Sequence, residues 1–269
     1  MTDKAQIVTL LGEEWSILSE LLGGLGDDGW SAPALPGWDV HDVVAHLIGT
    51  ERLLAGAEQP QLPADSDGLR HVRNEIGQVN EAWVIELRSR THAELLADFR
   101  AITAQRLASL EAMSQAEFDA DSWTPAGQAT YGRFMRIRLF DCWMHEQDIR
   151  TAVGLPGHEA GPIAEQALAE VTSALGYVVG KLGRAPDGSS VLISLTGPVE
   201  RELPVVVEGR ARLVDALPGS PTASLALSST LFFRLAGGRI DAAAAAGHIE
   251  SGGDAQLASQ IAANLAFTI

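Results

Sequence analysis

Apolar residues recur at intervals of three and four along most of the first half of the chain, a spacing typical of helices that bury one face. The clearest stripe runs through Ile7, Leu11, Trp15, Leu18, Leu22 and Leu25. Such stripes and their flanking caps predict helices over residues 7–25, 39–55, 72–87 and 131–153, and another that opens with a capping box at 91–94. Several long amphipathic helices joined by loops indicate a helical bundle.

Four stretches rich in glycine, proline or polar residues are predicted to be loops between these helices. They cover residues 23–29, 33–37, 58–68 and 122–130. The first of them matches the dinucleotide pattern GxGxxG, but it follows a helix rather than a strand and carries two aspartates that would repel a pyrophosphate. We therefore interpret it as a helix stop.

The hydrophobic period changes in the second half of the chain. One more helix is predicted near residues 163–182, and helices are also predicted over 229–236 and 254–266. Short β-rich runs separated by Gly and Pro predict strands over 190–196, 203–207, 210–213 and 223–227. The sequence thus predicts an α+β protein of two domains, a helical bundle over 1–156 and, over 157–269, an α+β domain with a small, mostly antiparallel sheet.

Composition narrows the function classes. The chain of 269 residues has a formal net charge of −16, which argues against nucleic-acid binding and against docking on an anionic membrane. No apolar stretch is long enough to span a bilayer, and the first residues lack the layout of a signal peptide. The single cysteine, Cys142, excludes an intramolecular disulfide. We expect a cytoplasmic protein that does not act on a membrane.

Three residues on two predicted helices form the best candidate site. Asp141 and His145 lie four residues apart, so they share one largely apolar helix face, and His46 lies inside an apolar stripe of the second helix. Two histidines and a carboxylate from bundle helices are a common transition-metal site, and three protein ligands suit catalytic zinc. The alternatives stay open: His46 as a hydrogen-bonded core residue, and Asp141 with His145 as an intrahelical pair.

Other chemistry-bearing motifs are incomplete. The segment from His145 begins like HExxH, but Ile149 stands where the second zinc-binding histidine is needed. There is no GxSxG nucleophile motif and no phosphate-binding P-loop. Cys142 could share a metal with His145, although a small buried hydrophobic role beside Trp143 is the simpler interpretation.

Two segments resemble the mycothiol-dependent maleylpyruvate isomerase family, a branch of the DinB-like metal-binding four-helix bundles. Residues 36–47, PGWDVHDVVAHL, are similar to the family's first signature, and residues 138–149, RLFDCWMHEQDI, are similar to its second, R-x-x-E-x-x-x-H-x-x-D. The resemblance implies an up-down four-helix bundle with His46, Asp141 and His145 as metal ligands. Asp141 stands where the family usually has Glu.

The C-terminal half resembles the domain attached in this family, which is related to sterol-carrier-protein folds. Residues 231–240 and 249–257 carry this similarity. In the family an arginine of the second domain serves the active site, and Arg239 is the best-placed match. Its alternative is a solvated turn arginine. Arg138, one turn before Asp141, is a second candidate for holding a substrate carboxylate.

The resemblance implies a metal-dependent enzyme, with zinc as the expected metal, that borrows the thiol of mycothiol as its nucleophile. Isomerisation of a maleylpyruvate-like compound and S-transfer to an electrophilic substrate both fit. We expect a small-molecule thiol and an electrophile as partners, an active cleft between the two domains, and a monomer or homodimer. A different class remains open, a non-catalytic binding module whose C-terminal domain carries an apolar small molecule.

Overall fold

The computed structural model describes residues 3–63 and 69–266. The chain divides into two compact units, which part after Gly157, one residue beyond the boundary expected from the sequence. Residues 64–68 of the predicted loop 58–68 lie outside the described residues. The helices of the described part include none that is both long and apolar enough to cross a membrane.

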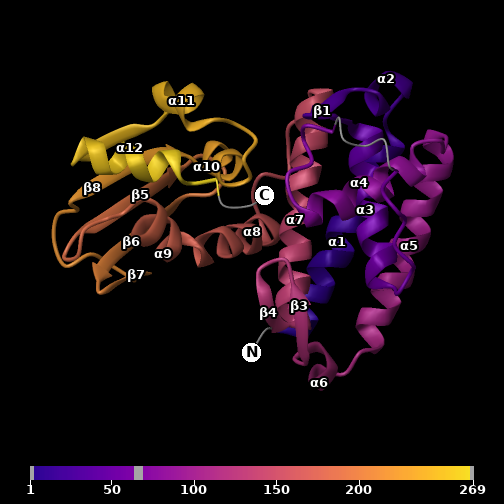
Figure 1. Ribbon diagram of the computed structural model, residues 1–269, viewed down its shortest axis with the longest axis horizontal. Coiled ribbons are helices and arrows are strands. Elements are labelled where there is room, and N and C mark those ends of the chain that lie inside the picture. The colour runs from indigo at the N-terminus through magenta and orange to yellow at the C-terminus, as the bar shows by residue number, and fades with distance from the viewer. Residues whose placement is uncertain (1–2, 64–68, 267–269) are drawn as a thin grey trace. The chain divides into compact units, whose positions relative to one another are not determined.

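The first unit is a helical bundle. Its helices over the described residues are α1 (Lys4–Gly23), α2 (Asp27–Trp30), α3 (Val40–Leu54), α4 (Glu75–Leu87), α5 (His92–Ala112), α6 (Gln115–Phe118) and α7 (Tyr131–Val153). Helices α1, α3, α5 and α7 run side by side (Figure 1). Helix α1 packs against α5 and α7, and helix α3 packs against α4, α5 and α7.

Local capping chemistry explains where the long helices begin and end. The Asp39 carboxylate accepts the backbone N–H of Asp42 at 2.9 Å and starts α3. Thr91 and Glu94 form the predicted capping box of α5. Gly154 adopts φ +67° and ends α7 in the left-handed conformation that favours glycine. The predicted helix at 72–87 begins later, because Asn74 caps α4.

Two of the predicted loops are instead short antiparallel ribbons. Strand β1 (Pro33–Leu35) pairs with β2 (Trp38–Asp39), and β3 (Asp121–Thr124) pairs with β4 (Gly127–Thr130). These strands are too short to show an alternating pattern, and each ribbon turns through a glycine with positive φ, Gly37 or Gly127. The prediction of a simple stop at 23–29 was also incomplete, since α2 begins there.

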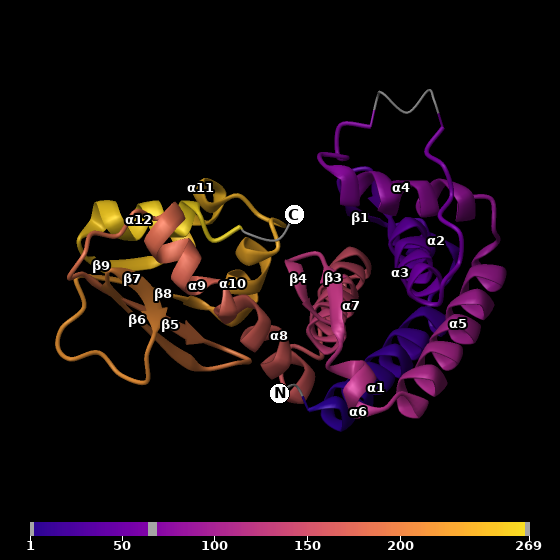
Figure 2. The same ribbon diagram turned by 60° about the horizontal axis from the view of Figure 1, so that its bottom comes forward.

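The second unit packs short helices on a mixed sheet. Figure 2 shows α9 and α12 on one face of this sheet. The strands lie in the order β7-β6-β5-β8-β9, and all neighbours are antiparallel except β5 and β8. The elements are α8 (Pro162–Ser173), α9 (Leu175–Tyr177), the π-helix η2 (Val178–Leu182), β5 (Ser190–Thr196), β6 (Arg201–Glu208), β7 (Arg210–Leu213), β8 (Ala223–Ser228), α10 (Ser229–Ala236), α11 (Ala242–Ala245), η3 (Ala246–His248), β9 (Glu250–Gly253) and α12 (Ala255–Ala263).

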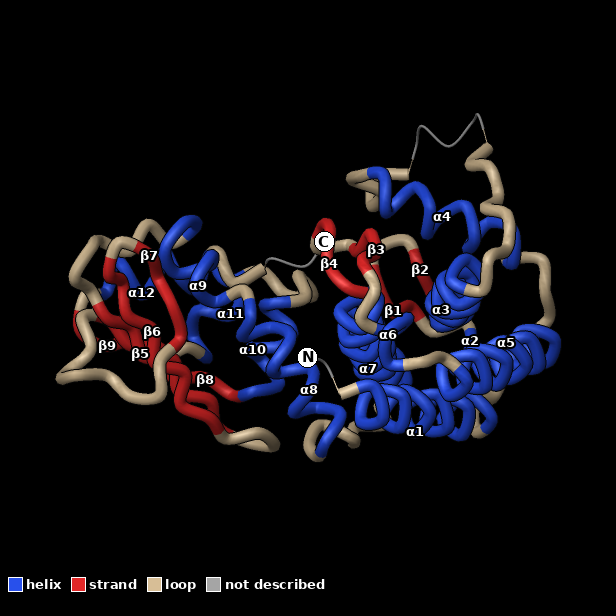
Figure 3. Tube along the Cα trace, turned by 90° about the horizontal axis from the view of Figure 1, so that it is seen from below, coloured by secondary structure: helices blue, strands red, loops and turns tan. Residues whose placement is uncertain are grey.

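The α+β class and the mostly antiparallel sheet are confirmed (Figure 3). Other details differ. The expected single helix at 163–182 divides into α8, α9 and η2, and the short helices α11 and η3 were not predicted. A Cβ on Gly176 would lie 2.6 Å from the Ala211 carbonyl oxygen, so the backbone of α9 lies against β7. Strand β9 was not predicted, because its sequence ESGG has no β-branched or aromatic residue.

Candidate functional site

The structure brings His46, Asp141 and His145 together inside the first unit. His46 comes from α3, and the other two come from adjacent turns of α7. The Nε2 atom of His46 lies 3.4 Å from Oδ2 of Asp141, and Nε2 of His145 lies 3.6 Å from its Oδ1. Ligand atoms of the three residues all lie within 4.8 Å of one another. Two imidazoles and one carboxylate therefore converge on a common point.

The charge states of these residues suit cation binding. Burial lowers the pKa of His46, against an opposing effect of Asp141, so its imidazole is neutral near pH 7. Burial alone would raise the pKa of Asp141, but Arg138, His145 and His46 lower it well below its ordinary value. The cluster thus presents an imidazole lone pair beside an ionised carboxylate, and the Asp141 side chain is still 32% exposed.

His145 is oriented by a further acid on the same helix. Its Nδ1 lies 3.0 Å from Oδ2 of Asp148, which is buried. A carboxylate at this position keeps the ring proton on Nδ1 and leaves the Nε2 lone pair directed at Asp141 and His46. Asp148 is the acid that ends the motif quoted above, so its position in the sequence already pointed to this contact.

The chemistry of the donor set fits a divalent transition metal. Zinc binds histidine nitrogen and carboxylate oxygen at about 2.0–2.2 Å, so two ligands at a tetrahedral angle lie roughly 3.3–3.5 Å apart. The Nε2 atom of His46 lies 3.4 Å from Oδ2 of Asp141, and Nε2 of His145 lies 3.6 Å from the other oxygen, Oδ1, so each separation is close to that span. The shorter arm of Asp, where the family usually has Glu, thus still reaches both imidazoles.

An aromatic wall stands beside the two histidines. The Trp38 ring centroid lies 5.4 Å from that of His46 and 6.5 Å from that of His145. Its indole N–H donates to Oε2 of Glu81 at 2.8 Å, and the same oxygen lies 2.9 Å from Nε2 of His71. Trp38 lies on β2 just before α3, so the ribbon that the sequence did not predict is what positions it.

Glu81 is fully buried on α4 and was missed by the sequence analysis. Arg88 lies 3.7 Å from its Oε1 and also donates to Asp42 at 3.0 Å. Helix α4 approaches α3 closely because Gly49 has no side chain: a Cβ there would lie 2.4 Å from Trp83. The one available sequence signal was that Glu81 falls within a mostly apolar helix segment.

Arg138 points into the bundle. The residue is only 2% exposed, and its Nε and Nη2 donate to Oε1 of Glu51 at 3.0 and 2.9 Å. Its Nη1 donates to Oδ2 of Asp141. The guanidinium thus faces two carboxylates of the protein, one of which belongs to the candidate site. The sequence analysis also missed Glu51. The signal that could have identified it was an acid five residues after His46 on a largely apolar helix.

Cys142 and Arg239 occupy different environments. Burial raises the pKa of the Cys142 thiol well above its ordinary value, so this cysteine stays protonated and is a packing residue. Arg239 belongs to the second unit, where it is half-buried after α10 and donates from Nη1 to the Gly237 carbonyl at 2.6 Å. This hydrogen bond lies within the second unit.

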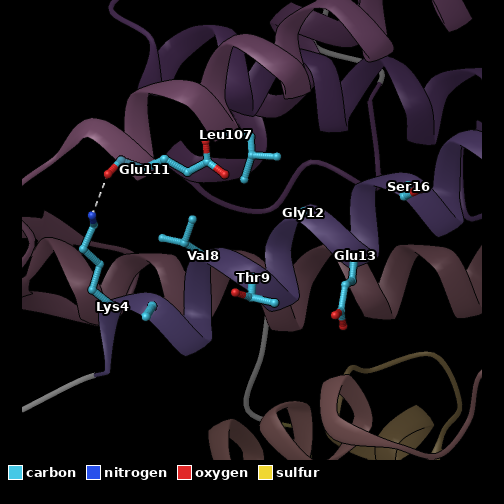
Figure 4. A pocket seen from close by; sticks show the side chains of 9 residues that line it. Lys4, Val8, Thr9, Gly12, Glu13, Ser16, Leu107 and Glu111 are labelled. Atoms are coloured by element: carbon cyan, nitrogen blue, oxygen red, sulfur yellow. Dashed lines mark hydrogen bonds between the residues drawn. The ribbon is translucent and has the colours of Figure 1, made fainter.

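A hollow of about 590 Å³ lies between α1 and α5 and is separate from the cluster (Figure 4). Figure 4 shows Lys4 bonded across it to the backbone of Glu111, with Leu107 beside Gly12. Its lining residues are Lys4, Ala5, Val8, Thr9, Gly12, Glu13, Ser16, Leu107 and Glu111. They include no histidine or cysteine, so the hollow has no metal-binding or nucleophilic chemistry comparable to the cluster.

Comparison with known proteins adds independent findings. Residues 11–150 match the family described as mycothiol maleylpyruvate isomerase N-terminal domain. The fold is similar to a crystal structure of the mycothiol-dependent maleylpyruvate isomerase, at 17% identity and a TM-score of 0.58. It is similar also to that of a histidine-to-alanine mutant, at 15% identity and a TM-score of 0.59. Each alignment covers 93% of both chains. No curated protein sequence matches significantly.

Proposed function

Because the chain belongs to the mycothiol maleylpyruvate isomerase N-terminal domain family, we propose that it is a metal-dependent enzyme that uses mycothiol to isomerise a maleylpyruvate-like substrate. The observation that carries this proposal is the convergence of His46, Asp141 and His145 within 4.8 Å of one another. Residues of the matched segment supply all three side chains, so family and geometry support the same site.

These three residues would hold the metal, and zinc suits two histidines and one carboxylate best. When bound, the metal supplies a concentrated positive charge that stabilises a thiolate near neutral pH. The carboxylate of Asp148, 3.0 Å from Nδ1 of His145, favours a proton on that nitrogen and would leave the Nε2 lone pair to bind the metal. Trp38 packs against both imidazoles and restricts their rotation.

The nucleophile has to be supplied by another molecule. Cys142 is the single cysteine of the chain, and burial keeps its thiol protonated. A free low-molecular-weight thiol solves this, because the thiolate is the reactive form and the protein only has to bind and orient it. Mycothiol is the thiol that the family description names. We assign it the role of cofactor, regenerated in each cycle.

The reaction is an addition followed by an elimination. When bound, the thiol would supply a nucleophile for one carbon of the cis double bond, and the conjugated carbonyl of the substrate would accept the electron pair of that bond. Rotation about the resulting single bond and loss of the thiolate, with return of the electron pair, would give the trans product. No proton or electron is gained or lost overall. A basic residue that binds the substrate carboxylate would assist, and we propose Arg239 for that role.

The proposal extends to the domains and location. We propose residues 1–156 as a DinB-like metal-binding domain and residues 157–269 as a sterol-carrier-like domain of a cytoplasmic enzyme. A reducing cytosol keeps a low-molecular-weight thiol in its active form. S-transfer to an electrophile uses the same thiolate but leaves the sulfur on the product, so product analysis distinguishes the two reactions.

The test is an isomerase assay on protein purified without chelator. Wild-type protein should convert maleylpyruvate to its trans isomer only when mycothiol is present, as followed by proton NMR. His46→Ala should lose this activity, whereas His248→Ala, at an exposed histidine of the second unit, should retain it. A stable thioether product would establish S-transfer instead. No reaction and no metal in the wild-type protein would support the non-catalytic carrier.

A further inference from the structure

A buried chain of charged groups connects the candidate site to the centre of the bundle. Arg106 of α5 donates from Nε to Oε2 of Glu51 at 3.0 Å. Glu51, on α3, accepts Arg138 on its other oxygen, and Arg138 donates to Asp141. At the far end, Nη2 of Arg106 donates to the Tyr131 hydroxyl at 2.7 Å. This series of hydrogen-bonded charged groups therefore links three helices and ends on Asp141, a candidate metal ligand.

The charges along this chain balance. Two arginines alternate with two carboxylates, and Glu51, Arg106 and Arg138 are each almost completely buried. Removing one member leaves a buried charge uncompensated, which is far more costly than losing an exposed ion pair. Each oxygen of Glu51 accepts from one arginine. The positive charge of Arg138 is therefore shared between Glu51 and Asp141, and the Asp141 carboxylate keeps lone pairs available to bind a metal.

The same groups fix the distance between the two helices that carry the histidines. Glu51 lies five residues after His46 on α3, and Arg138 lies three residues before Asp141 on α7. The Glu51–Arg138 contact thus holds α3 against α7 beside the site. The short Asp141 side chain can adopt few positions in which it reaches the metal. Its position therefore depends on Arg138, which donates a hydrogen bond to its carboxylate.

We propose that Arg138, anchored by Glu51, is a positioning residue that aims the Asp141 carboxylate at the bound metal, rather than a group that binds substrate. This inference rests on the proposed function, because it presupposes that His46, Asp141 and His145 bind a metal. The guanidinium donates to Glu51 through Nε and Nη2 and to Asp141 through Nη1. Its fork geometry can serve both carboxylates at once, which the point charge of a lysine cannot do.

Titration of the metal-free protein with Zn²⁺ in a competing chelator tests this. Arg138→Lys keeps the charge and loses the fork, and Glu51→Gln keeps the shape and loses the charge. Each should weaken zinc binding about 10–100-fold, the usual cost of losing a partner of a metal ligand. Asp98→Asn is the control: it breaks the partly exposed Arg52–Asp98 pair (2.9 Å), which joins α3 to α5, and should leave the affinity within about twofold.

A double-mutant comparison separates positioning from a general structural effect. If Arg138 acts through Asp141, then Arg138→Lys should add less than about threefold to the loss already caused by Asp141→Asn. Circular dichroism reports the folded fraction, and the affinity is calculated for that fraction. Should Arg138→Lys not fold, the pair Glu51→Gln and Asp141→Asn gives the same comparison.

Two results would overturn the inference: zinc affinities of Arg138→Lys and Glu51→Gln that match the Asp98→Asn control, or the same fold-loss with and without the Asp141 carboxylate. Failure of the wild-type protein to bind zinc is a separate outcome. That result removes the proposed function itself, and the positioning role with it.

Discussion

Helix α7 takes part in two carboxylate clusters in which the pKa of an acid is shifted in opposite directions. At the Glu51 cluster, which comprises Arg106, Glu51, Arg138 and Asp141, arginines alternate with acids, and the pKa of Asp141 is lowered well below its ordinary value. At the second, Glu14 of α1 meets Glu146 of α7, both fully buried. There burial and the neighbouring Glu146 raise the pKa of Glu14 well above its ordinary value, although Arg150 opposes this.

The difference shows what the bundle does with a buried acid. Beside Arg138 and the two histidines, Asp141 stays ionised and can serve a cation. Where Glu14 meets Glu146, burial and the second acid favour the protonated form of Glu14, although Arg150 donates to Glu146. The ionised cluster extends to His46 and His145, so an ionised carboxylate lies beside both imidazoles of the candidate metal site.

Removing one of the arginines that neutralise Glu51 should have the largest effect on the free energy of unfolding. Arg106→Met removes the arginine on Oε2 of Glu51 and the donor to the Tyr131 hydroxyl. We expect a loss of about 3–5 kcal/mol in the free energy of unfolding, the usual cost of breaking a buried ion pair. Urea denaturation of the metal-free protein measures it. A loss below about 1 kcal/mol would show that the cluster is not a compensated unit.

The carboxylate of Asp141 should control metal affinity. Asp141→Asn removes the ionised donor, and its zinc affinity should fall by more than about 100-fold, beyond the cost of losing an outer partner. Asp141→Glu should keep or raise the affinity, because it restores the acid that is usual in the family. Isothermal titration on the three proteins checks this. Much weaker binding by the Glu variant would mean that the site is built around aspartate.

A third buried acid, Glu81, allows the comparison to be sharpened. It is surrounded by His71, Arg88 and the Trp38 indole, so it resembles the compensated cluster. Trp38→Phe removes the indole donor and should cost about 1–3 kcal/mol in unfolding free energy, because a buried acceptor loses a partner. Thermal unfolding measures this. An unchanged midpoint would mean that the Trp38–Glu81 bond does not hold the aromatic wall in place.

The smallest expected effect is at the carboxylate pair. A carboxyl group whose pKa is raised by folding contributes stability below its unfolded pKa and loses that contribution as pH rises toward the folded pKa. Glu14→Gln removes the ionisable group and with it this loss of stability at high pH. The free energy of unfolding of the variant should therefore exceed that of wild type by about 1 kcal/mol at pH 8, and by less at pH 5. Unfolding curves at both values check the sign. Equal differences at pH 5 and pH 8 would contradict a protonated Glu14.

The sequence predicted the parts of the molecule whose causes are local. Helix α7 was predicted with its bounds, because Thr130 and Gly154 cap it and its apolar stripe is long. His46, Asp141 and His145 were found because their spacing and motifs are local too. The ribbons and strand β9 were missed, since strand pairing between short segments depends on contacts that are distant along the chain.

The partners of the buried acids around the site could not be paired from the sequence for the same reason. Glu51 meets Arg138 across 87 positions of sequence, and Glu81 meets Trp38 across 43. No periodicity within one helix reveals such partners. Arg138 was predicted to hold a substrate carboxylate because it lies one turn before Asp141 on the same helix face. In the structure it is buried, and its guanidinium donates to Glu51 and Asp141.

Metal content is the most direct test of the central claim, that His46, Asp141 and His145 form a metal centre. Wild-type protein and the His46→Ala variant are purified without chelator, soaked in zinc, desalted and measured by elemental analysis. The account predicts close to one zinc per wild-type chain and well under one for His46→Ala at equal folded content. Wild-type protein with no bound metal, or a variant that holds as much zinc as wild type, would contradict it.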